Sequence, residues 1–230
     1  MISVQNRFRT AAAGIPVLLL LLVSCGGRSG KAPAPEKAAA RHFPSVSVPM
    51  AYDNDSVRLD YLCEHYWDGF FGGSGDTDSS LVLGVPKAEL EQAFANYTAV
   101  LNMIGNPGTG DGDGMAGRLE KTDRAMLHLF SQLSARQRAD SASALYTAFT
   151  QMVGSYLYDP NSPVRDEDLY LPFVREMAAS DLTPDAMRTA YAYEASCCAL
   201  NRRGSVAPDF RIKRADGSIF RLHSYSHSFR

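Results

Sequence analysis

The chain has no Cys-x-x-Cys motif, no marked excess of charge of either sign, and no apolar run of the roughly 20 residues that span a bilayer. The first absence excludes a dithiol redox centre in these residues. The formal net charge of -2 at pH 7 leaves no basic face for nucleic acid. No Ser/His/Asp set, phosphate-binding loop or zinc-ligand spacing stands out. We therefore expect this chain not to be an enzyme and to hold no cofactor or metal.

The N-terminus has the pattern of a secretory signal peptide. Two arginines precede the apolar run Ile15 to Val23, and the small residue Ser24 comes directly before Cys25. The string Leu-Val-Ser-Cys resembles the lipobox of bacterial lipoproteins, in which the cysteine is lipidated and becomes the first residue of the mature chain. This resemblance implies a signal peptide over residues 1–24 and a lipid on Cys25. The alternatives are an ordinary signal peptide with an incidental cysteine, or an N-terminal membrane anchor.

Residues 25–41 read as a flexible tether. They are mostly Gly, Ser, Lys, Ala and Pro, a composition that buries too little surface to offset chain entropy. Lipoproteins of the resembling type carry two or three acyl chains, and each buried CH₂ contributes about 0.8 kcal/mol, so the anchoring would be permanent. No acidic cluster of the kind associated with surface export in Bacteroidota follows Cys25. We therefore expect an outer-membrane protein that faces the periplasm rather than the cell surface.

Three cysteines remain after Cys25, and the odd number leaves at least one thiol unpaired within a monomer. Cys197 and Cys198 are neighbours in a helical pattern, where a disulfide between them would be strained. A bridge from Cys63 to either one stays open at this point. Free thiols, buried or partly buried, are the simpler prediction.

Apolar residues recur at helical spacing over residues 42–203, which predicts a mainly α domain built as a bundle of about six amphipathic helices. The clearest stripe, at steps of four and three, is Leu90, Phe94, Tyr97, Leu101 and Ile104. A similar stripe comprises Met115, Leu119, Thr122, Met126, Leu129 and Leu133, and a third comprises Ala142, Leu145, Phe149, Met152, Val153 and Tyr156. These stripes must pack on one another, because each fully buried large side chain contributes roughly 1.5–3 kcal/mol.

Local signals place the ends of several helices. Asp55 or Ser56 is expected to cap a first helix that runs to about Trp67, and Pro86 suits a first helical position. A further helix is expected from about residue 166 to residue 179, with Pro172 either bending it or delaying its start. Thr183, followed by a proline and an acid, predicts the start of the last helix, which runs to about residue 201.

The pattern changes after Gly204. Two extended runs flank Asp216-Gly217, which predicts a β-hairpin over residues 207–222. Its apolar side chains are Phe210, Ile212, Ile219 and Leu222. An isolated hairpin is marginally stable in water, so we expect this one to belong to a larger sheet.

Several strings in the helical region resemble an uncharacterised helical domain of Bacteroidota lipoproteins, the domain of unknown function numbered 5106. The resemblance covers about residues 42–201 and brings no biochemical activity with it. It rests on Phe43-Pro44, Tyr61 to Asp68, Gln92 to Tyr97, Tyr156 to Pro163 and Leu169 to Pro172.

The segment from residue 204 resembles the start of a thioredoxin-like domain of the TlpA and peroxiredoxin type. The strings that carry it are Gly204 to Phe210, which contains Ala-Pro-Asp-Phe, and Asp216 to Ser218. In such proteins the redox Cys-x-x-Cys comes roughly 30 residues later, and this sequence ends at Arg230. The resemblance therefore implies that residues 204–230 are the truncated start of that domain, and it transfers no active-site residue.

Three other groups of residues were candidate sites. His65, Tyr66 and Trp67 lie near the end of the first expected helix; either they line a groove for a peptide or ligand, or Tyr66 and Trp67 anchor the core while His65 points outward. Asp111 and Asp113 lie in a Gly-rich loop. That loop lacks the oxygen ligand and the Glu that a calcium loop needs at its fifth and twelfth positions, so we expect no calcium there.

Histidine and acidic residues elsewhere have simpler explanations. His223 and His227 are four residues apart in a Ser-rich tail without an evident third metal ligand. Asp60 with Glu64, and the charged residues 165–168, are expected on solvated faces or at a helix start.

Taken together, the sequence predicts a lipid-anchored protein of the cell envelope. Its helical domain would be a non-catalytic module for interaction or positioning, with the membrane reached through the N-terminal lipid and a protein partner in the envelope. The alternative is a fragment of a periplasmic thiol-disulfide oxidoreductase whose Cys-x-x-Cys domain lies outside this chain.

Overall fold

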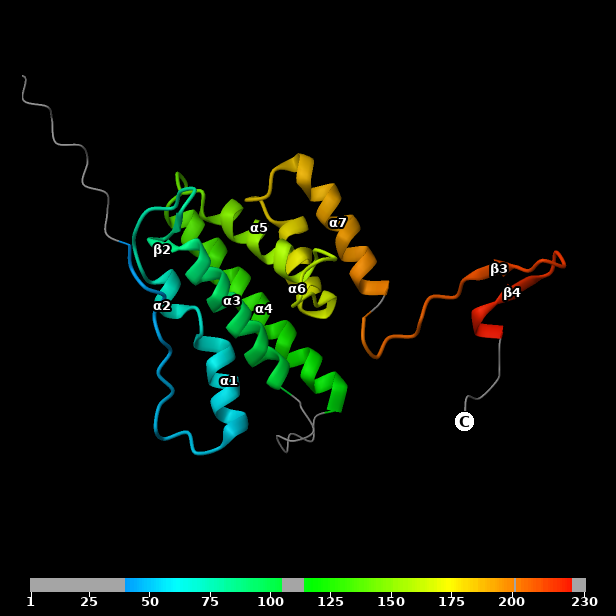
Figure 1. Ribbon diagram of the computed structural model, residues 1–230, viewed down its shortest axis with the longest axis horizontal. Helices are drawn as coiled ribbons and strands as arrows, with labels where there is room; N and C mark the ends of the chain where they lie inside the picture. Colours follow the sequence, from blue (N-terminus) through cyan, green and yellow to red (C-terminus); the bar gives the residue numbers. More distant parts are fainter. Residues whose placement is uncertain (1–39, 105–113, 201, 225–230) are drawn as a thin grey trace, which may run out of the picture. The chain divides into compact units, whose positions relative to one another are not determined.

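The computed structural model describes residues 40–104, 114–200 and 202–224, and their fold is mainly α with a C-terminal β-hairpin, as predicted (Figure 1). Six helices of 11 to 26 residues carry the fold, and a four-residue helix lies between the first two. They are α1 (Asp55–His65), α2 (Asp68–Phe71), α3 (Lys87–Met103), α4 (Gly114–Ala139), α5 (Leu145–Leu157), α6 (Glu167–Ala179) and α7 (Asp185–Leu200). Over the described residues, none of these helices combines the length and the apolar character that crossing a membrane requires.

The longest helix, α4, is the centre of the bundle. It packs against α1, α2, α5 and α6, while α7 packs mainly on α6. The stripe predicted on α3 is confirmed, because each of its five side chains is at most 2% exposed. On α4 the stripe is buried from Thr122 onward, whereas Met115 is 47% exposed at the start of the helix.

Trp67 lies at the centre of an aromatic cluster that joins four parts of the chain. Its ring makes edge contacts with Phe43, Phe70, Tyr97 and Phe149, at centroid distances between 5.3 and 5.7 Å. The indole is 1% exposed. Edge-to-face geometry is the favoured arrangement for aromatic pairs, so this cluster adds directional contacts to the burial of apolar surface.

The first helices differ from the sequence expectation. Asn54, rather than Asp55 or Ser56, caps α1, because its side-chain oxygen accepts the N–H groups of Ser56 at 2.8 Å and Val57 at 3.4 Å. The helix ends at His65, and the chain turns at Trp67 into α2. The break lets Trp67 and the two phenylalanines of α2 face the same core.

A two-stranded ribbon, β1 (Leu81–Val82) and β2 (Val85–Pro86), was not predicted. Its two-residue turn places Leu83 at φ 49° and Gly84 at φ 77°, the left-handed conformation that tight hairpin turns require. Leucine adopts this conformation at a cost, and here its side chain is 1% exposed in the core. Pro86 therefore ends the ribbon, one residue before α3.

Three other boundaries need comment. Helix α5 begins at Leu145, so Ala142 lies in the preceding turn and does not join the stripe. Pro172 lies inside α6 and does not delay its start, because Asp166 caps the helix at the N–H groups of Asp168 and Leu169. The hydroxyl of Thr183, 2% exposed, lies 2.7 Å from the hydroxyl of Tyr146 and ties the start of α7 to α5.

The predicted C-terminal hairpin is confirmed as β3 (Arg211–Lys213) and β4 (Ile219–Arg221). Ile212 pairs with Phe220, and the connecting turn contains Gly217 at φ 84°. The side chain of Ile212 is 47% exposed and that of Ile219 is 66% exposed. A short 3-10 helix, Leu222–Ser224, follows β4.

Candidate functional site

Arginine side chains hold the two ends of the helical domain. At the first end, which we call the N-terminal clasp, Arg41 donates from Nε to the carbonyl of Leu83 at 2.6 Å and from Nη2 to the carbonyl of Phe70 at 2.8 Å. Its guanidinium carbon lies 5.5 Å from the centroid of the Phe70 ring, within cation–π range. Burial lowers the pKa of Arg41, but its ordinary value is so high that the group stays charged.

The surroundings of Arg41 are built to admit a guanidinium. A Cβ at Gly73 would lie 2.4 Å from the central carbon of the guanidinium, so a side chain there would displace the guanidinium from this position. The backbone N–H of Arg41 donates to the carbonyl of Gly84 at 2.9 Å. Arg41 thus bonds both residues of the strained turn, and its contacts help to stabilise that conformation.

Phe43 continues the N-terminal attachment. Its ring packs against Tyr66, Trp67 and Phe70, and its backbone N–H donates to Oε1 of Glu89 at 2.8 Å. The first described residues are therefore fixed to the body of the domain by backbone bonds, a guanidinium and an aromatic ring.

The three predicted groove residues lie at different depths. Trp67 is in the core, and Tyr66 is half-buried with its hydroxyl donating to the carbonyl of Ala93 at 2.9 Å. His65 is at the surface, where Nδ1 lies 2.8 Å from Oδ2 of Asp68. The pKa of Asp68 is lowered on balance: burial raises it, and hydrogen bonds from His65 and Gln132 outweigh that effect. A groove formed by these three residues stays a prediction.

The second arginine cluster, the C-terminal clasp, holds the chain where it leaves α7. Arg202 Nη2 lies 2.6 Å from Oδ2 of Asp123 on α4. Both side chains are largely buried, with 22% of Arg202 and 28% of Asp123 exposed. This pair connects the segment after α7 to the central helix.

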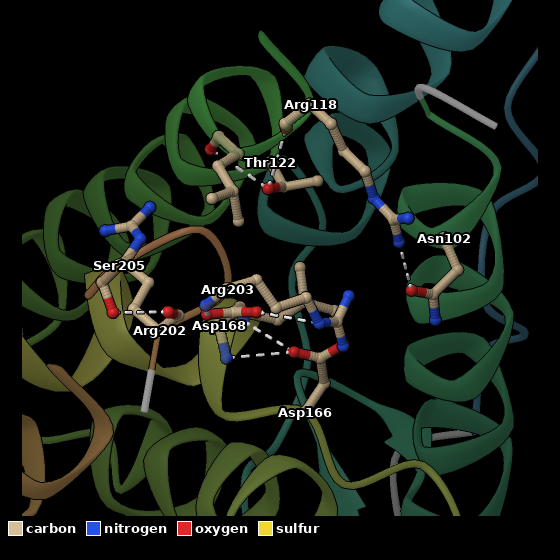
Figure 2. A network of polar contacts seen from close by, with 10 residues as sticks. Asn102, Arg118, Thr122, Asp166, Asp168, Arg202, Arg203 and Ser205 are labelled. Carbon is tan, nitrogen blue, oxygen red and sulfur yellow. Dashed lines mark hydrogen bonds and ion pairs between the residues drawn. The ribbon is translucent and has the colours of Figure 1, made fainter. Parts of the chain in front are cut away.

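Arg203 forms the other half of the C-terminal clasp, at the start of α6 (Figure 2). Its Nη2 lies 2.9 Å from Oδ2 of Asp166, and its Nε lies 3.0 Å from Oδ2 of Asp168. The backbone N–H of Arg203 also donates to Oδ1 of Asp168 at 3.2 Å. The side chains of Asp166 and Asp168 are only 10% and 9% exposed, so this pair is more shielded from water than a typical surface ion pair.

Neither clasp was predicted from the sequence. The helix-start prediction for residues 165–168 is confirmed, because Asp166 caps α6 and Asp168 lies in its first turn. The solvated-face alternative does not apply to Asp168, whose carboxylate is shielded by Arg203. Neither Arg41 nor the Arg202-Arg203 pair was singled out. The only local signal was two adjacent arginines at the end of the last helix.

A small cavity of about 140 Å³ lies between α1 and α4. Asp60 and Glu64 line one side of it, and Lys121 and His128 line the other, with Lys121 Nζ 3.5 Å from Oδ2 of Asp60. Cys63 is also among its lining residues. Asp60 and Glu64 are both exposed, as expected for a solvated face, and Lys121 pairs with the first of them.

The three cysteines in the described residues are free thiols, in agreement with the simpler prediction. Burial, then the nearby charge of Asp60, raises the pKa of Cys63 to about 12. Burial, then the charge of Glu167, raises the pKa of Cys198 to about 12. A redox role would need a lowered thiol pKa, so these two thiols do not have the properties of reactive cysteines.

The structure describes only some of the remaining positions that were considered from the sequence. Cys25, Asp111, Asp113 and His227 lie outside the described residues. The Nε2 atom of His223 lies 2.6 Å from the carbonyl of Ala207, so its ring packs back on the hairpin segment. Over the described part of the chain, no group of three or more His, Cys, Asp or Glu side chains has metal-binding geometry.

Comparison with a solved structure supports the same arrangement of helices. A thioredoxin-like protein from Bacteroides caccae superposes with a TM-score of 0.59 at 24% sequence identity, covering 80% of this chain. This chain spans 58% of the length of that protein. Identity at this level shows a shared fold and no more.

Comparison by sequence gives the family. No curated protein matches the chain. The family model described as "Domain of unknown function (DUF5106)" matches residues 24–146 and 135–198, which together span most of the sequence. This chain therefore belongs to the DUF5106 family.

Proposed function

We propose that this chain is a lipid-anchored protein of the cell envelope whose helical domain is a non-catalytic positioning module. In this proposal the domain fixes the direction of the segment that follows α7, and that segment belongs to a thioredoxin-like unit. The lipid on Cys25 would hold the protein at the periplasmic face of the outer membrane. The tether predicted over residues 25–41 would set its reach, ending before Arg41, which is attached to the helical domain.

The C-terminal clasp is the observation that carries the proposal. Arg202 and Arg203 come directly after α7 and bind carboxylates on two different helices, α4 and α6. Two charged attachments on adjacent residues restrict the backbone more than a single flexible pair would. Ser205 adds a local restraint, because its N–H and its hydroxyl both donate to the carbonyl of Arg202, at 3.1 and 2.6 Å.

The non-catalytic part of the proposal is supported by the thiols. Cys63 and Cys198 stay protonated in the neutral range because burial raises the pKa of each to about 12. The alternative, part of a periplasmic thiol-disulfide oxidoreductase, would place the reacting cysteines outside this sequence. Both versions assign the helical domain the same positioning role.

The positioning role is tested by loosening the C-terminal clasp. In Arg203→Gln, the backbone amides of residues 202–205 should become mobile in ¹⁵N relaxation measurements, while in the parent protein they should be as rigid as those of α6. The matched control is Arg138→Gln, which removes an exposed pair with Asp181 at 2.6 Å. Equal rigidity of residues 202–205 in the parent and Arg203→Gln would contradict a positioning role for the clasp.

The lipid anchor is tested separately. In a bacterial host that processes lipoproteins, the parent protein should fractionate with membranes and carry the added mass of acyl chains. Cys25→Ala should lose both properties, and Cys197→Ala should keep them. An unmodified parent protein, or membrane retention of the unmodified Cys25→Ala, would reject lipidation at this cysteine.

A further inference from the structure

A second cavity, of about 460 Å³, opens between α5, α6 and α7. Three tyrosines line it, one from the end of α5, one from α6 and one from α7, together with two carboxylates and a glycine. These residues are Tyr158, Tyr170, Tyr191, Asp159, Glu194 and Gly154. The rest of its lining is uncharged, so no lining residue is basic.

Two of the tyrosines, Tyr158 and Tyr170, form one connected unit with Glu194. The hydroxyl of Tyr170, whose side chain is 2% exposed, donates to Oε2 of Glu194 at 2.8 Å. The ring of Tyr158 stacks on that of Tyr170 with a centroid distance of 5.0 Å and an interplanar angle of 22°. The buried hydroxyl therefore holds the Glu194 carboxylate in place beside the aromatic lining.

The negative charge of the cavity has no internal counterion. Among the described residues, neither Glu194 nor Asp159 takes part in an ion pair with a Lys, Arg or His side chain. Elsewhere in this domain the acids that lie close to the core do have such partners, as Asp123 and Asp168 show. Aromatic surface and unneutralised carboxylates thus come together in this cavity.

Gly154 contributes open space to the cavity. Glycine inside a helix is destabilising relative to alanine. At Gly154 a Cβ would lie 3.8 Å from the hydroxyl of Tyr170, an ordinary contact distance. Packing with the protein therefore does not require glycine here, whereas a larger side chain would occupy the cavity.

We propose that this cavity binds an alkylammonium ligand. Aromatic faces attract organic cations, and a fixed carboxylate adds charge attraction beside them. The two carboxylates would repel an anion. A neutral apolar ligand would lie beside both carboxylates without any charge attraction to them. The proposal uses residues outside both clasps, so it does not rest on the positioning function.

The test compares choline with its neutral isostere 3,3-dimethylbutan-1-ol by NMR titration of the full chain. Choline should bind roughly 5- to 10-fold more tightly, since the two differ only in the charged nitrogen. Glu194→Gln, which still accepts the Tyr170 hydroxyl, should remove most of that preference. Tyr158→Leu should weaken choline binding by roughly 2- to 5-fold. Tyr193→Leu, at a side chain 70% exposed on α7, is the matched control and should bind as the parent does.

Gly154→Leu separates loss of the site from loss of the fold. Leucine favours helix over glycine, so the melting temperature should stay unchanged or rise by about 2 °C while choline binding disappears. Vesicles distinguish the sources of the cation. Co-sedimentation with phosphatidylcholine vesicles that is lost in Glu194→Gln would assign a lipid headgroup, and binding of free choline without vesicle binding would assign a soluble ligand. Absence of saturable choline binding, or equal binding of the neutral isostere, would overturn the proposal.

Discussion

The two clasps use the same side chain against different partners. In the N-terminal clasp Arg41 binds backbone carbonyls of Leu83 and Phe70, whereas in the C-terminal clasp Arg203 binds the carboxylates of Asp166 and Asp168. A carbonyl does not titrate, and its attraction to a guanidinium is screened little by salt when the site is partly buried. A carboxylate adds a negative charge, which strengthens its attachment to the guanidinium. If the guanidinium is removed, the shielded carboxylate is left unpaired and the folded state is destabilised.

The difference suggests different roles for the two ends. The N-terminal clasp is joined to a strained turn and to the aromatic cluster around Trp67, so it belongs to the core. The C-terminal clasp lies where the chain leaves the bundle, and Arg203 itself is 46% exposed. We therefore expect the first to govern folding and the second to govern the order of the segment that follows.

The largest effect is expected at the N-terminal clasp. Arg41→Met keeps the apolar stem and removes the donors to two carbonyls, which should lower the free energy of unfolding by about 2–3 kcal/mol. Urea unfolding followed by tryptophan fluorescence measures this change at Trp67. Arg58→Met, at an exposed position of α1, is the control and should change stability by less than about 0.5 kcal/mol. A loss of that small size in Arg41→Met would show that the N-terminal attachment is not part of the core.

The next largest effect is expected at the C-terminal clasp. Arg203→Gln leaves two shielded carboxylates without a cation and should cost about 1–2 kcal/mol, less than a fully buried pair because Arg203 is half exposed. Added salt should lower the free energy of unfolding of the parent protein, and it should lower that of the variant less. The double variant Arg203→Gln with Asp168→Asn should recover part of the loss, since one unpaired charge is removed. A double variant that is less stable than Arg203→Gln would argue against repulsive unpaired charge as the cause.

Thiol labelling can report on the two ends of the domain separately, because each end contains one buried cysteine. Cys63 is on α1, close to the aromatic cluster, and Cys198 is on α7, just before Arg202. With a pKa of about 12, each should react slowly with iodoacetamide at neutral pH. Arg41→Met should accelerate labelling of Cys63 and Arg203→Gln that of Cys198, as read by peptide mass spectrometry. Equal acceleration of both thiols in each variant would mean that the domain opens only as a whole.

The same thiols set the direction of an alkaline effect. An unfolded thiol has a pKa near 9.0, and the folded values lie near 12. Between these values the unfolded chain binds fewer protons than the folded one, so the free energy of unfolding should fall as pH rises from about 9 toward 12. Below pH 9 the thiols stay protonated in both the folded and the unfolded state. There they do not make the free energy of unfolding depend on pH. Replacing Cys63 and Cys198 by alanine should reduce the slope, and an unchanged slope would assign it to other groups.

The smallest effect is expected from the C-terminal segment. Deleting residues 204–230 should change the melting temperature by less than about 2 °C, because the strand side chains Ile212 and Ile219 are largely exposed. Deleting residues 202–230 also removes both arginines of the C-terminal clasp. This deletion should lower the free energy of unfolding by at least about as much as Arg203→Gln does. Calorimetry of the two truncated chains measures the difference. A fall of several degrees after the shorter deletion would show that the hairpin packs into the core.

Much of the helical pattern could be predicted from local sequence. The α3 stripe and the turn at Asp216-Gly217 depend on spacing and glycine, and both are confirmed. The ribbon around Leu83 and Gly84 was missed because its strands have two residues each, too short for an alternating pattern. A single glycine between apolar residues was the only signal.

The sequence alone determined features that depend on residues close together in the chain. These are the mainly helical class and the C-terminal hairpin, and free thiols were the simpler of the two predictions for the cysteines. Tertiary structure decided which charges matter. Arg41 meets a carbonyl 42 positions away and Arg203 meets a carboxylate 37 positions away. Such contacts form only after the helices have packed, because packing removes water from both partners and fixes their distance. No local pattern encodes that step, so the clasps and the tyrosine-lined cavity became visible only in the folded chain.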